Sequence, residues 1–324
     1  MQVARLAGVS PITASRALST PDKVSADALQ RVRDAVKRSG YVRNMLAGGL
    51  ASSRSRLVAA IVPTIAGSVF LDMVQALTVT LNDAGYQVML GQSGYDNSRE
   101  DSLLDAIIGR RPDGIVITGV MHSAHARQRL IASGIPVVET WDLTPHPVDM
   151  LVGFSHEQTG AAVARYVMEH GYRHAAVISA NDVRARRRAQ AFVDTIREDG
   201  AATVAPVQWV SAPTNLKQGR LTLPRLLERH PETDSVFCSS DLLALGVMIE
   251  AHARGIPVPS RLGVIGFGDL SFAAELHPPL TTVRIEGARI GERAAGFIVQ
   301  RAAGETVEQR ILDIGYSIVS RGSA

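Results

Sequence analysis

The chain has 324 residues, of which 46% are hydrophobic, 20% charged and only 5% aromatic, a composition typical of a globular protein that exceeds one ordinary domain. Its longest apolar runs are only as long as β-strands and its first residues lack an apolar core, so the sequence predicts neither a membrane span nor a secretory signal. A single cysteine, Cys238, excludes a disulfide framework and a cysteine-based metal site, and we therefore expect a cytoplasmic protein.

The charge is distributed unevenly along the chain. Residues 1–56 contain ten Lys and Arg against three acids, a net charge of +7, whereas the whole chain carries only +3. The remainder is therefore mildly acidic. A basic segment on an acidic body predicts that this segment binds a polyanion, although a solvated charged face would give the same count.

Two short helices are predicted at the start of the chain. Residues 2–7 form the first, and Gly8 supplies the turn that follows it. Ser10 and Pro11 begin the second, because serine caps a helix and proline suits its first position. This second helix continues to about Ser19. Its apolar and small side chains available for packing are Ile12, Ala14, Ala17 and Leu18.

A third helix, predicted over residues 25–39, would place Ala28, Val32 and Val36 on one face and so close a three-helix core. Two short helices joined by a tight glycine turn are typical of a helix-turn-helix, whose second helix enters the major groove of DNA. Small alanines at helix crossings would also arise from packing alone. Together with the positive charge, however, the pattern predicts DNA binding.

From residue 57 the pattern changes to apolar strands that alternate with amphipathic helices. The first series has strands at 57–62, 86–90, 114–118 and 135–139, and helices at 70–84, 98–109 and 123–133. The second has strands at 174–179, 235–239 and 263–267, and helices at 156–170, 185–198, 217–229 and 241–254. Such strands are typical of parallel sheets covered on both faces. Two such sheets predict two lobes with a ligand cleft at the carboxyl ends of the strands.

The sequence contains little that indicates catalysis. It has neither a Walker loop nor a nucleophile elbow, and "GFGD" at 266–269 is typical of a turn after a strand rather than a phosphate-binding loop. His122 and His125 lie three residues apart with no further ligand nearby. We therefore expect a protein that is not an enzyme and needs no metal or cofactor.

Four arginines occur in "RARRRAQAF", residues 184–192, at a predicted junction between a strand and a helix that faces the cleft. Cations at a helix N-terminus oppose the helix dipole, so this cluster favours a bound anion. The alternative is an exposed basic helix face.

The segments "VARLAGVSPITASRAL", from residue 3, and "VSADALQRVRDAVKRSGYVRNMLAGGLASSRS", from residue 24, resemble the DNA-binding head and hinge of the lactose-repressor (LacI/GalR) family. The similarity continues to the last residue. It starts with the first helix already under way, without the family's usual threonine cap, which we interpret as a displaced start or a truncation. The resemblance implies an α/β fold, with a small all-α helix-turn-helix head followed by a two-lobed periplasmic-binding-protein-like body with parallel sheets.

The resemblance also implies the domain limits. The helix-turn-helix domain would span 1–42, the hinge helix and linker 43–56, and the effector-binding and dimerisation body 57–324. Chain crossings between the lobes are expected near 154–156, 284 and 313. They would divide the body into an N-lobe of about 57–154 plus 284–312 and a C-lobe of about 155–283 plus 313–324.

In this family the second helix of the head contacts DNA, and the hinge contacts the minor groove. The matching positions imply a leucine, Leu50, wedged between base pairs, and a hinge helix capped by Asn44. Gly48 and Gly49 each weaken this helix by about 1 kcal/mol, so it is expected to fold only on operator DNA. The DNA-binding residues expected from the resemblance are Ser10, Pro11, Ile12, Thr13, Ser15, Arg16, Asn44, Ala47 and Leu50.

The effector pocket departs from the family pattern. Most members carry an aspartate after the strand that matches "GVIGF", where it binds sugar hydroxyls, but this chain has Gly268 there and Asp269 one residue later. The family's pocket arginine is retained as Arg188. Losing a carboxylate while keeping an arginine indicates an anionic ligand. Segments such as "GYQVMLGQSGYDNSREDSL" and "VFCSSDLLALG" resemble the gluconate-utilisation repressor branch, which implies gluconate, a related sugar acid or its phosphate.

The effector-binding residues that the resemblance implies are Ser68, Phe70, Tyr95, Glu139, Trp141, Arg188, Ser240 and Asp241. Glu139 and Trp141 are expected to end their strand at the cleft. The resulting prediction is a homodimeric repressor of carbohydrate catabolism that binds a pseudo-palindromic operator.

Three alternatives remain at this point. A regulator of the same family could respond to a neutral sugar or a nucleobase, because the fold does not determine the ligand. A solute-binding protein for transport would need an export signal and no basic head. An enzyme with a DNA-binding head would need a catalytic pair in the cleft.

Overall fold

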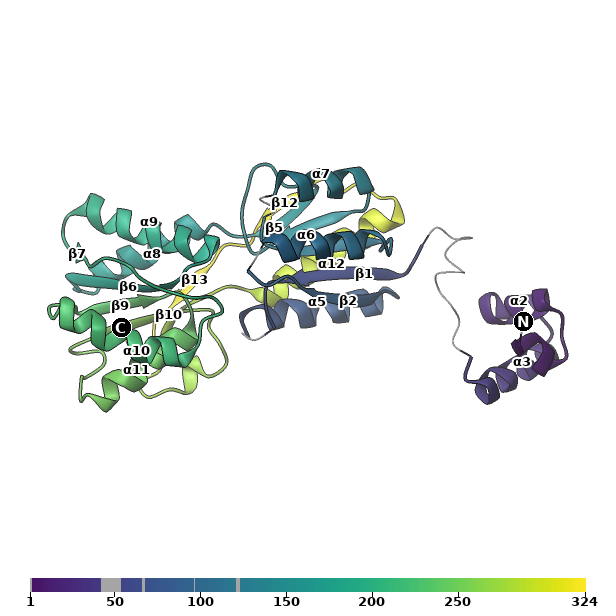
Figure 1. The fold of residues 1–324 in the computed structure, drawn as a ribbon, viewed down its shortest axis with the longest axis horizontal. Helices are drawn as coiled ribbons and strands as arrows, with labels where there is room; N and C mark the ends of the chain where they lie inside the picture. Colours follow the sequence, from purple (N-terminus) through teal and green to yellow (C-terminus); the bar gives the residue numbers. More distant parts are fainter. Residues whose placement is uncertain (1, 42–53, 66–67, 96, 121–122) are drawn as a thin grey trace. The chain divides into compact units, whose positions relative to one another are not determined.

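The computed structural model describes residues 2–41, 54–65, 68–95, 97–120 and 123–324, with the side chains of residues 68 and 97–100 excepted (Figure 1). The chain forms two compact units, Met1–Ser55 and Arg56–Ala324, called the head and the body below. The predicted hinge helix, with Asn44, Ala47 and Leu50, lies outside the described residues, as does His122. Within the described ranges, no helix combines the length and the apolar character that a bilayer crossing requires.

The described part of the head contains the α-helices α1 (Gln2–Ala7), α2 (Pro11–Ser19) and α3 (Ala26–Ser39), with a 3-10 turn η1 (Pro21–Lys23) before α3. Gly8 adopts a positive φ of 62° at the turn between α1 and α2. The Ser10 hydroxyl caps α2 by accepting a hydrogen bond from the Thr13 N–H at 3.1 Å. The predicted glycine turn and serine cap are therefore confirmed.

Small side chains from all three helices build the core of the head. The predicted face of α3 is confirmed, since Ala28 and Val32 are buried and the half-buried Val36 packs against the core. Ala35 is also fully buried, because it lies seven residues after Ala28 and so returns to the same helical stripe. The expected packing of Ile12 is wrong, since 65% of its surface is exposed.

The first lobe of the body is a six-stranded parallel sheet in the order β12-β5-β4-β3-β1-β2. Its strands are β1 (Leu57–Val62), β2 (Gln87–Gln92), β3 (Gly114–Thr118), β4 (Val137–Thr140), β5 (Met150–Gly153) and β12 (Ile311–Asp313). Its helical elements are η2 (Ser68–Phe70), α5 (Leu71–Asp83), α6 (Asn97–Ile108), α7 (Ala124–Ser133) and α12 (Gly287–Ala303).

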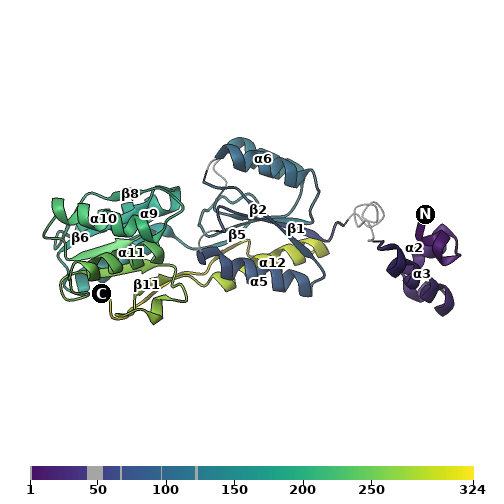
Figure 2. The same cartoon turned by 60° about the horizontal axis from the view of Figure 1, so that its bottom comes forward.

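Helices cover both faces of this first sheet. The side chains of β1 alternate between two apolar clusters, because successive residues of a strand point to opposite faces. Val58, Ala60 and Val62 belong to the cluster that contains α5 and α12, and Ala59 and Ile61 to the cluster that contains α6 and α7. Figure 2 shows α6 on one side of the sheet and α5 with α12 on the other.

The second lobe has a seven-stranded sheet in the order β13-β11-β10-β9-β6-β7, with β8 also paired to β6. Its strands are β6 (His174–Ala180), β7 (Thr203–Val204), β8 (Gln208–Val210), β9 (Ser235–Cys238), β10 (Gly263–Phe267), β11 (Thr281–Arg284) and β13 (Ser317–Val319). Its helical elements are α8 (His156–Glu169), α9 (Val183–Asp199), α10 (Leu216–Arg229), α11 (Asp241–Ala253) and η3 (Ala273–Glu275). β13 runs antiparallel to β11, so this sheet is not wholly parallel as expected.

The chain passes between the two sheets three times, after β5, after β11 and after β12. Each lobe is therefore built from separate parts of the sequence, which Figure 1 shows as a change of colour within each lobe. The helices expected in both lobes are present within a few residues of their predicted limits. The regular pattern did not indicate α12 or the short strands β5, β7, β8, β11, β12 and β13.

Helices α8 and α9 approach each other closely at Gly160, where a Cβ atom would collide with the backbone carbonyl of Arg188. The close approach brings the backbone of α9 against α8. Glycine is required here because any side chain would push the two helices apart.

We predict that Gly160→Ala lowers the free energy of unfolding by about 1–3 kcal/mol, because the added methyl group overpacks the contact between α8 and α9. Gly296→Ala is the matched control, since Gly296 also lies within a helix but has nothing within 4 Å of an added Cβ. Alanine there should leave stability unchanged or raise it by up to about 1 kcal/mol. Urea unfolding followed by circular dichroism measures both changes, and equal effects would contradict the close approach.

Candidate functional site

A cavity lies between the two lobes of the body, beyond the carboxyl ends of several parallel strands. It comprises about 750 Å³ of empty space, part of which is open solvent. Its lining residues come from both lobes and include Thr64, Phe70, Tyr95, Trp141, His156, Asp182, Arg184, Arg188, Thr214, Ser239, Ser240 and Phe267. Ligands of open α/β sheets bind at this edge, as the sequence predicted.

Aromatic rings form the apolar part of the cavity wall. The Trp141 ring meets Phe70 edge-on with 5.1 Å between centroids, and Phe154 behind it at 5.9 Å. The Trp141 indole N–H points at the Met73 sulfur, 3.1 Å away. Trp141 also has a positive φ of 61°, a backbone conformation that bulky residues rarely adopt and that often occurs at functional sites.

Arg188 is the most unusual side chain of the cavity, because it is a buried cation that forms no ion pair with any acid in the described part of the chain, although Asp182 and Asp142 are near enough to act on its charge. It is 5% exposed, and its guanidinium lies 3.8 Å above the Phe267 ring. One terminal nitrogen lies 3.0 Å from His156 Nδ1, and the other donates to the Ser239 carbonyl at 3.3 Å. Within the described ranges of the chain, the buried Nε atom has no hydrogen-bond partner. Burial lowers the pKa of Arg188 to about 10, so the group remains charged at neutral pH.

Arg184 lies one helical turn before Arg188 and lines the same cavity. Its guanidinium donates to the Thr118 carbonyl of the first lobe at 3.3 Å and lies 5.5 Å from the Phe70 ring centre. Asp182 is the single acid among the described residues that line this cavity, and it caps α9 by accepting from the Ala185 N–H. Positive charge therefore exceeds negative charge in the cavity wall.

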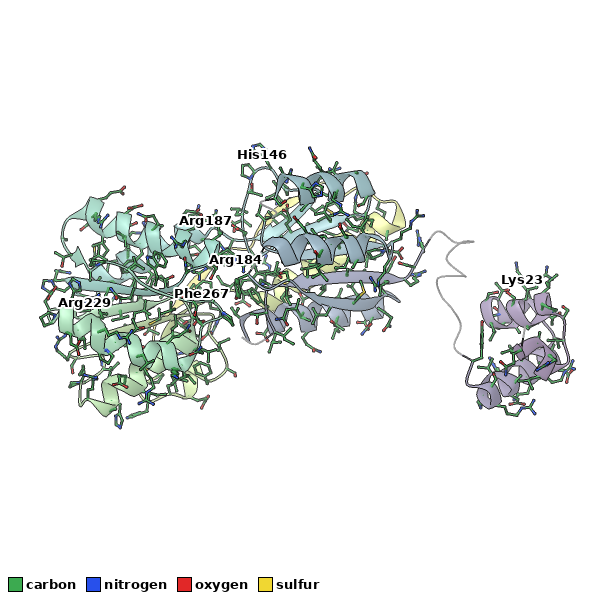
Figure 3. All side chains as sticks on the ribbon, in the orientation of Figure 1. Lys23, His146, Arg184, Arg187, Arg229 and Phe267 are labelled. Atoms are coloured by element: carbon green, nitrogen blue, oxygen red, sulfur yellow. The ribbon has the colours of Figure 1, made fainter. Side chains whose placement is uncertain are left out.

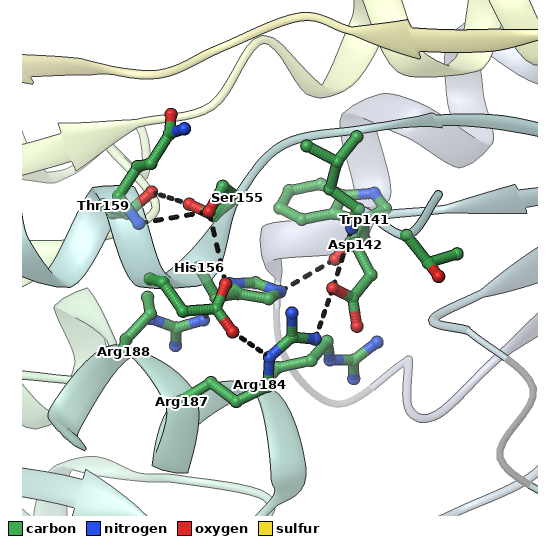
Figure 4. Close-up of polar contacts among 12 residues, drawn as sticks. Trp141, Asp142, Ser155, His156, Thr159, Arg184, Arg187 and Arg188 are labelled. Atoms are coloured by element: carbon green, nitrogen blue, oxygen red, sulfur yellow. Dashed lines mark hydrogen bonds and ion pairs between the residues drawn. The ribbon is translucent and has the colours of Figure 1, made fainter. Parts of the chain in front are cut away.

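The expectation that all four arginines of residues 184–192 face the cleft is wrong for two of them. Arg187 forms ion pairs with Asp142 of the first lobe, at 2.7 Å, and with Glu157, at 2.5 Å (Figure 4). Arg186 lies 4.6 Å over the Trp209 ring, outside the cavity. Successive residues of a helix point about 100° apart, so four neighbouring side chains cannot share one direction. Figure 3 shows Arg184, Arg187 and Phe267 at the junction of the lobes.

Of the predicted effector-binding residues, five line the cavity: Phe70, Tyr95, Trp141, Arg188 and Ser240. Glu139 does not line it, because its fully buried carboxylate accepts a hydrogen bond from the Val148 N–H at 2.7 Å. The side chain of Ser68 lies outside the described residues.

Asp241 also lies beneath the cavity rather than in its wall. Its carboxylate accepts from the Thr282 hydroxyl at 2.5 Å and from the Leu270 N–H at 2.7 Å. Burial raises the pKa of Asp241 to about 6. Leu270 itself lines the cavity, so Asp241 holds a piece of the wall in place.

The loop at Gly268 carries the departure from the family pattern, and neither Gly268 nor Asp269 lines the cavity. Gly268 has a φ of 130°, and the side chain of Asp269 forms ion pairs with Arg284 at 2.6 Å and Arg321 at 2.7 Å. Asp269 is therefore engaged outside the cavity and does not replace the missing aspartate.

Sequence reasoning missed several residues of the cavity wall: Thr64, His156, Asp182, Thr214, Ser239 and Phe267. Arg184 was included only as part of the basic cluster, although its four-residue spacing from Arg188 could have placed both on one helical face. The others had no local signal. Among the described residues, no group of three or more His, Cys, Asp or Glu side chains is arranged to hold a metal ion.

In the head, the predicted DNA-contacting side chains lie on the outer face of α2. Ser10, Pro11, Ile12, Ser15 and Arg16 are exposed, while the half-buried Thr13 shares a hydrogen bond with the Ser10 hydroxyl at 2.8 Å. The opposite face of α2 packs through Ala14 and Ala17. This arrangement leaves the polar face of the helix free for a partner.

Comparison with known proteins agrees with both parts of this picture. Residues 1–44 match the family of bacterial regulatory proteins of the lacI family, and residues 164–324 match a periplasmic binding protein-like domain. The HTH-type transcriptional regulator GntR of Pseudomonas aeruginosa is 35% identical over 323 residues, covering 99% of this chain and 94% of that protein.

Solved structures agree as well. A LacI-family transcriptional regulator from Silicibacter pomeroyi is 32% identical, with a TM-score of 0.93 over 99% of this chain and 98% of that one. The lac repressor dimer bound to operator and the anti-inducer ONPF has the same fold, with a TM-score of 0.83 and 20% identity over 99% and 97% of the two chains. These relatives are regulators rather than enzymes, and the chain belongs to the LacI family of DNA-binding transcriptional regulators.

Proposed function

We propose that this regulator is a repressor of carbohydrate catabolism whose effector is a sugar acid, such as gluconate, a related aldonate or its phosphate. The observation that carries the proposal is Arg188, a buried guanidinium in the cavity wall that, among the described residues, has no ion-paired acid and no hydrogen-bond partner for its Nε. A buried charge without a counter-ion is costly, and a carboxylate or phosphate group on the ligand would compensate it.

Polar groups beside the cavity support a ligand that carries hydroxyls as well as charge. An adjoining chamber shares Tyr95, Asp182 and Arg184 with the cavity. Two buried atoms of residues lining this chamber, the Thr118 hydroxyl oxygen and Asp142 Oδ2, find no hydrogen-bond partner among the residues that the structure describes. Ligand hydroxyls would satisfy both, since a hydroxyl can donate and accept. The sequence resemblance to the gluconate-utilisation branch points to the same class.

The effector would act by changing the relation between the lobes. Because the cavity wall comes from both lobes, a ligand that contacts both favours one arrangement of the lobes over others. In a homodimer, this change would alter the spacing of the two hinges and so the affinity of the heads for a pseudo-palindromic operator. Binding of the effector would then change the affinity of the protein for the operator, and binding of the operator would change its affinity for the effector.

A neutral sugar or a nucleobase is the second candidate effector. It is favoured by the aromatic part of the wall, where Phe70, Trp141 and Phe267 offer ring faces and edges to a flat or apolar ligand surface. A neutral sugar or a nucleobase would, however, supply no negative charge to compensate the Arg188 guanidinium.

We expect gluconate or another aldonate to raise the melting temperature of the protein, because a ligand that binds only the folded state stabilises it by mass action. Thermal unfolding against gluconate, 6-phosphogluconate, other aldonates, neutral hexoses and purines tests this. A shift with only a neutral sugar or a purine would retain the regulator and refute the anionic effector.

Arg188→Ala should abolish the response of operator binding to the sugar acid while leaving operator binding itself intact, since Arg188 belongs to the cavity of the body. The matched control is Arg197→Ala, an exposed position further along α9, which should respond as the original protein does. Fluorescence anisotropy of labelled operator with and without ligand measures both. A full response from Arg188→Ala would disprove the assignment.

Arg16→Lys should reduce the preference for operator over random DNA while keeping most of the non-specific affinity. Lysine preserves the charge of this exposed residue, but it cannot make the two-pronged contact of arginine with a guanine, worth about 1–3 kcal/mol of discrimination. Arg16→Ala should also weaken the salt dependence of binding if Arg16 contacts phosphate as well. Unchanged specificity in both variants would exclude Arg16 from base recognition.

A further inference from the structure

His156 is a buried imidazole that joins the two lobes at the cavity. It is the first residue of α8, in the second lobe, and only 1% of its surface is exposed. One ring nitrogen, Nε2, lies 3.0 Å from the Trp141 carbonyl oxygen of the first lobe, as Figure 4 shows. The other, Nδ1, lies 3.0 Å from a terminal nitrogen of Arg188. The ring also packs edge-on against Phe154, with 4.7 Å between centroids.

The two partners of His156 allow one tautomer. A guanidinium has only donors, so Nδ1 must accept the hydrogen bond from Arg188. A backbone carbonyl only accepts, so Nε2 must carry the proton and donate it to Trp141. Both ring nitrogens are then satisfied, and the ring cannot turn over without losing both contacts.

The surroundings keep this imidazole neutral. The ring is buried, and the charged groups that face it are Arg184, Arg187 and Arg188 on α9. Burial and then these cations lower the pKa of His156 well below 6.5, while the bond to the Trp141 carbonyl opposes them only in part. A protonated ring would point a second donor at Arg188, so the neutral form is also the one that the geometry requires.

We propose that His156 is a positioning residue for the effector: it holds the Arg188 guanidinium toward the anionic end of the ligand and links that orientation to the backbone of Trp141 in the other lobe. This proposal rests on the proposed function, in which Arg188 binds the acid group.

A neutral acceptor suits this task better than a carboxylate would. An aspartate or glutamate at this position would also orient the arginine, but it would neutralise the charge that the ligand needs. His156 and the Ser239 carbonyl together hold both terminal nitrogens without contributing a negative charge, and the Nε of Arg188 remains unpaired. The arrangement therefore fixes the direction of the cation and preserves its charge for an anion.

The contact with Trp141 extends the effect of the ligand across the cavity. Trp141 lines the cavity with its ring, and its carbonyl receives the His156 proton. Through His156, the Arg188 guanidinium is thus connected to the backbone of the first lobe by two hydrogen bonds. Any movement of the guanidinium on binding would change the contact between α8 and the end of β4.

The test is isothermal titration calorimetry of the full chain with two probes, gluconate and its neutral amide, gluconamide. His156→Leu removes both hydrogen bonds and should weaken gluconate binding by at least about ten-fold, because the bond to the charged Arg188 is lost. It should change gluconamide binding by less than about three-fold. His156→Gln offers one acceptor and one donor and should restore gluconate affinity to within about three-fold of the original.

Each remaining outcome decides the proposal. Equal losses for the two probes in His156→Leu would show that the ring only fills space, and unchanged gluconate binding would show that Arg188 needs no support. Melting temperatures of both variants report whether they fold.

Nitrogen-15 NMR of the imidazole provides a measurement that needs no ligand, and it separates this proposal from the proposed function. A neutral ring protonated at Nε2 and unchanged between pH 5.5 and 8 is expected. The other tautomer, or titration in this range, would overturn the positioning role even if gluconate binds. If the original protein binds no sugar acid, the proposed function and the effector role of His156 both fail, even where NMR finds the expected tautomer.

Discussion

The buried charge of Arg188 is the constraint around which the ligand-binding body is arranged. The guanidinium is removed from water, lies against an aromatic ring and is held by two neutral acceptors, while no acid among the described residues pairs with it. Burial of a lone cation opposes folding, so it is tolerated only where the surroundings fix it firmly or a ligand compensates it. In this protein the surroundings fix the orientation of the Arg188 guanidinium, and we infer that the ligand supplies the compensating negative charge.

The same two helices that hold this cation also join the lobes. From α9, Arg187 reaches Asp142 and Arg184 reaches the Thr118 carbonyl, and from the start of α8 His156 reaches the Trp141 carbonyl. The close approach at Gly160 keeps α8 and α9 packed together. A ligand that displaces any of these groups therefore acts directly on the contacts between the lobes. This arrangement is suited to converting binding in the cavity into a change of shape.

The head has a hydrophobic core of its own. Its core consists of alanines and valines from three short helices, and the exposed side of α2 carries the side chains suited to DNA. The two compact units thus divide the tasks of a regulator, since one presents a polar helix and the other contains the cavity.

The sequence by itself determined the features that depend on near neighbours in the chain. The Gly8 turn, the Ser10 cap, most helices of the body and the pocket position of Arg188 all follow from local pattern or from family resemblance. Only the tertiary structure decided which side chains meet. The Glu139 carboxylate accepts a hydrogen bond from the Val148 N–H, and the Asp241 carboxylate accepts one from the Leu270 N–H beneath the cavity. His156 contacts Arg188, 32 residues away. These contacts join segments distant in the chain, and hydrogen bonds between such segments leave no periodic trace in the sequence.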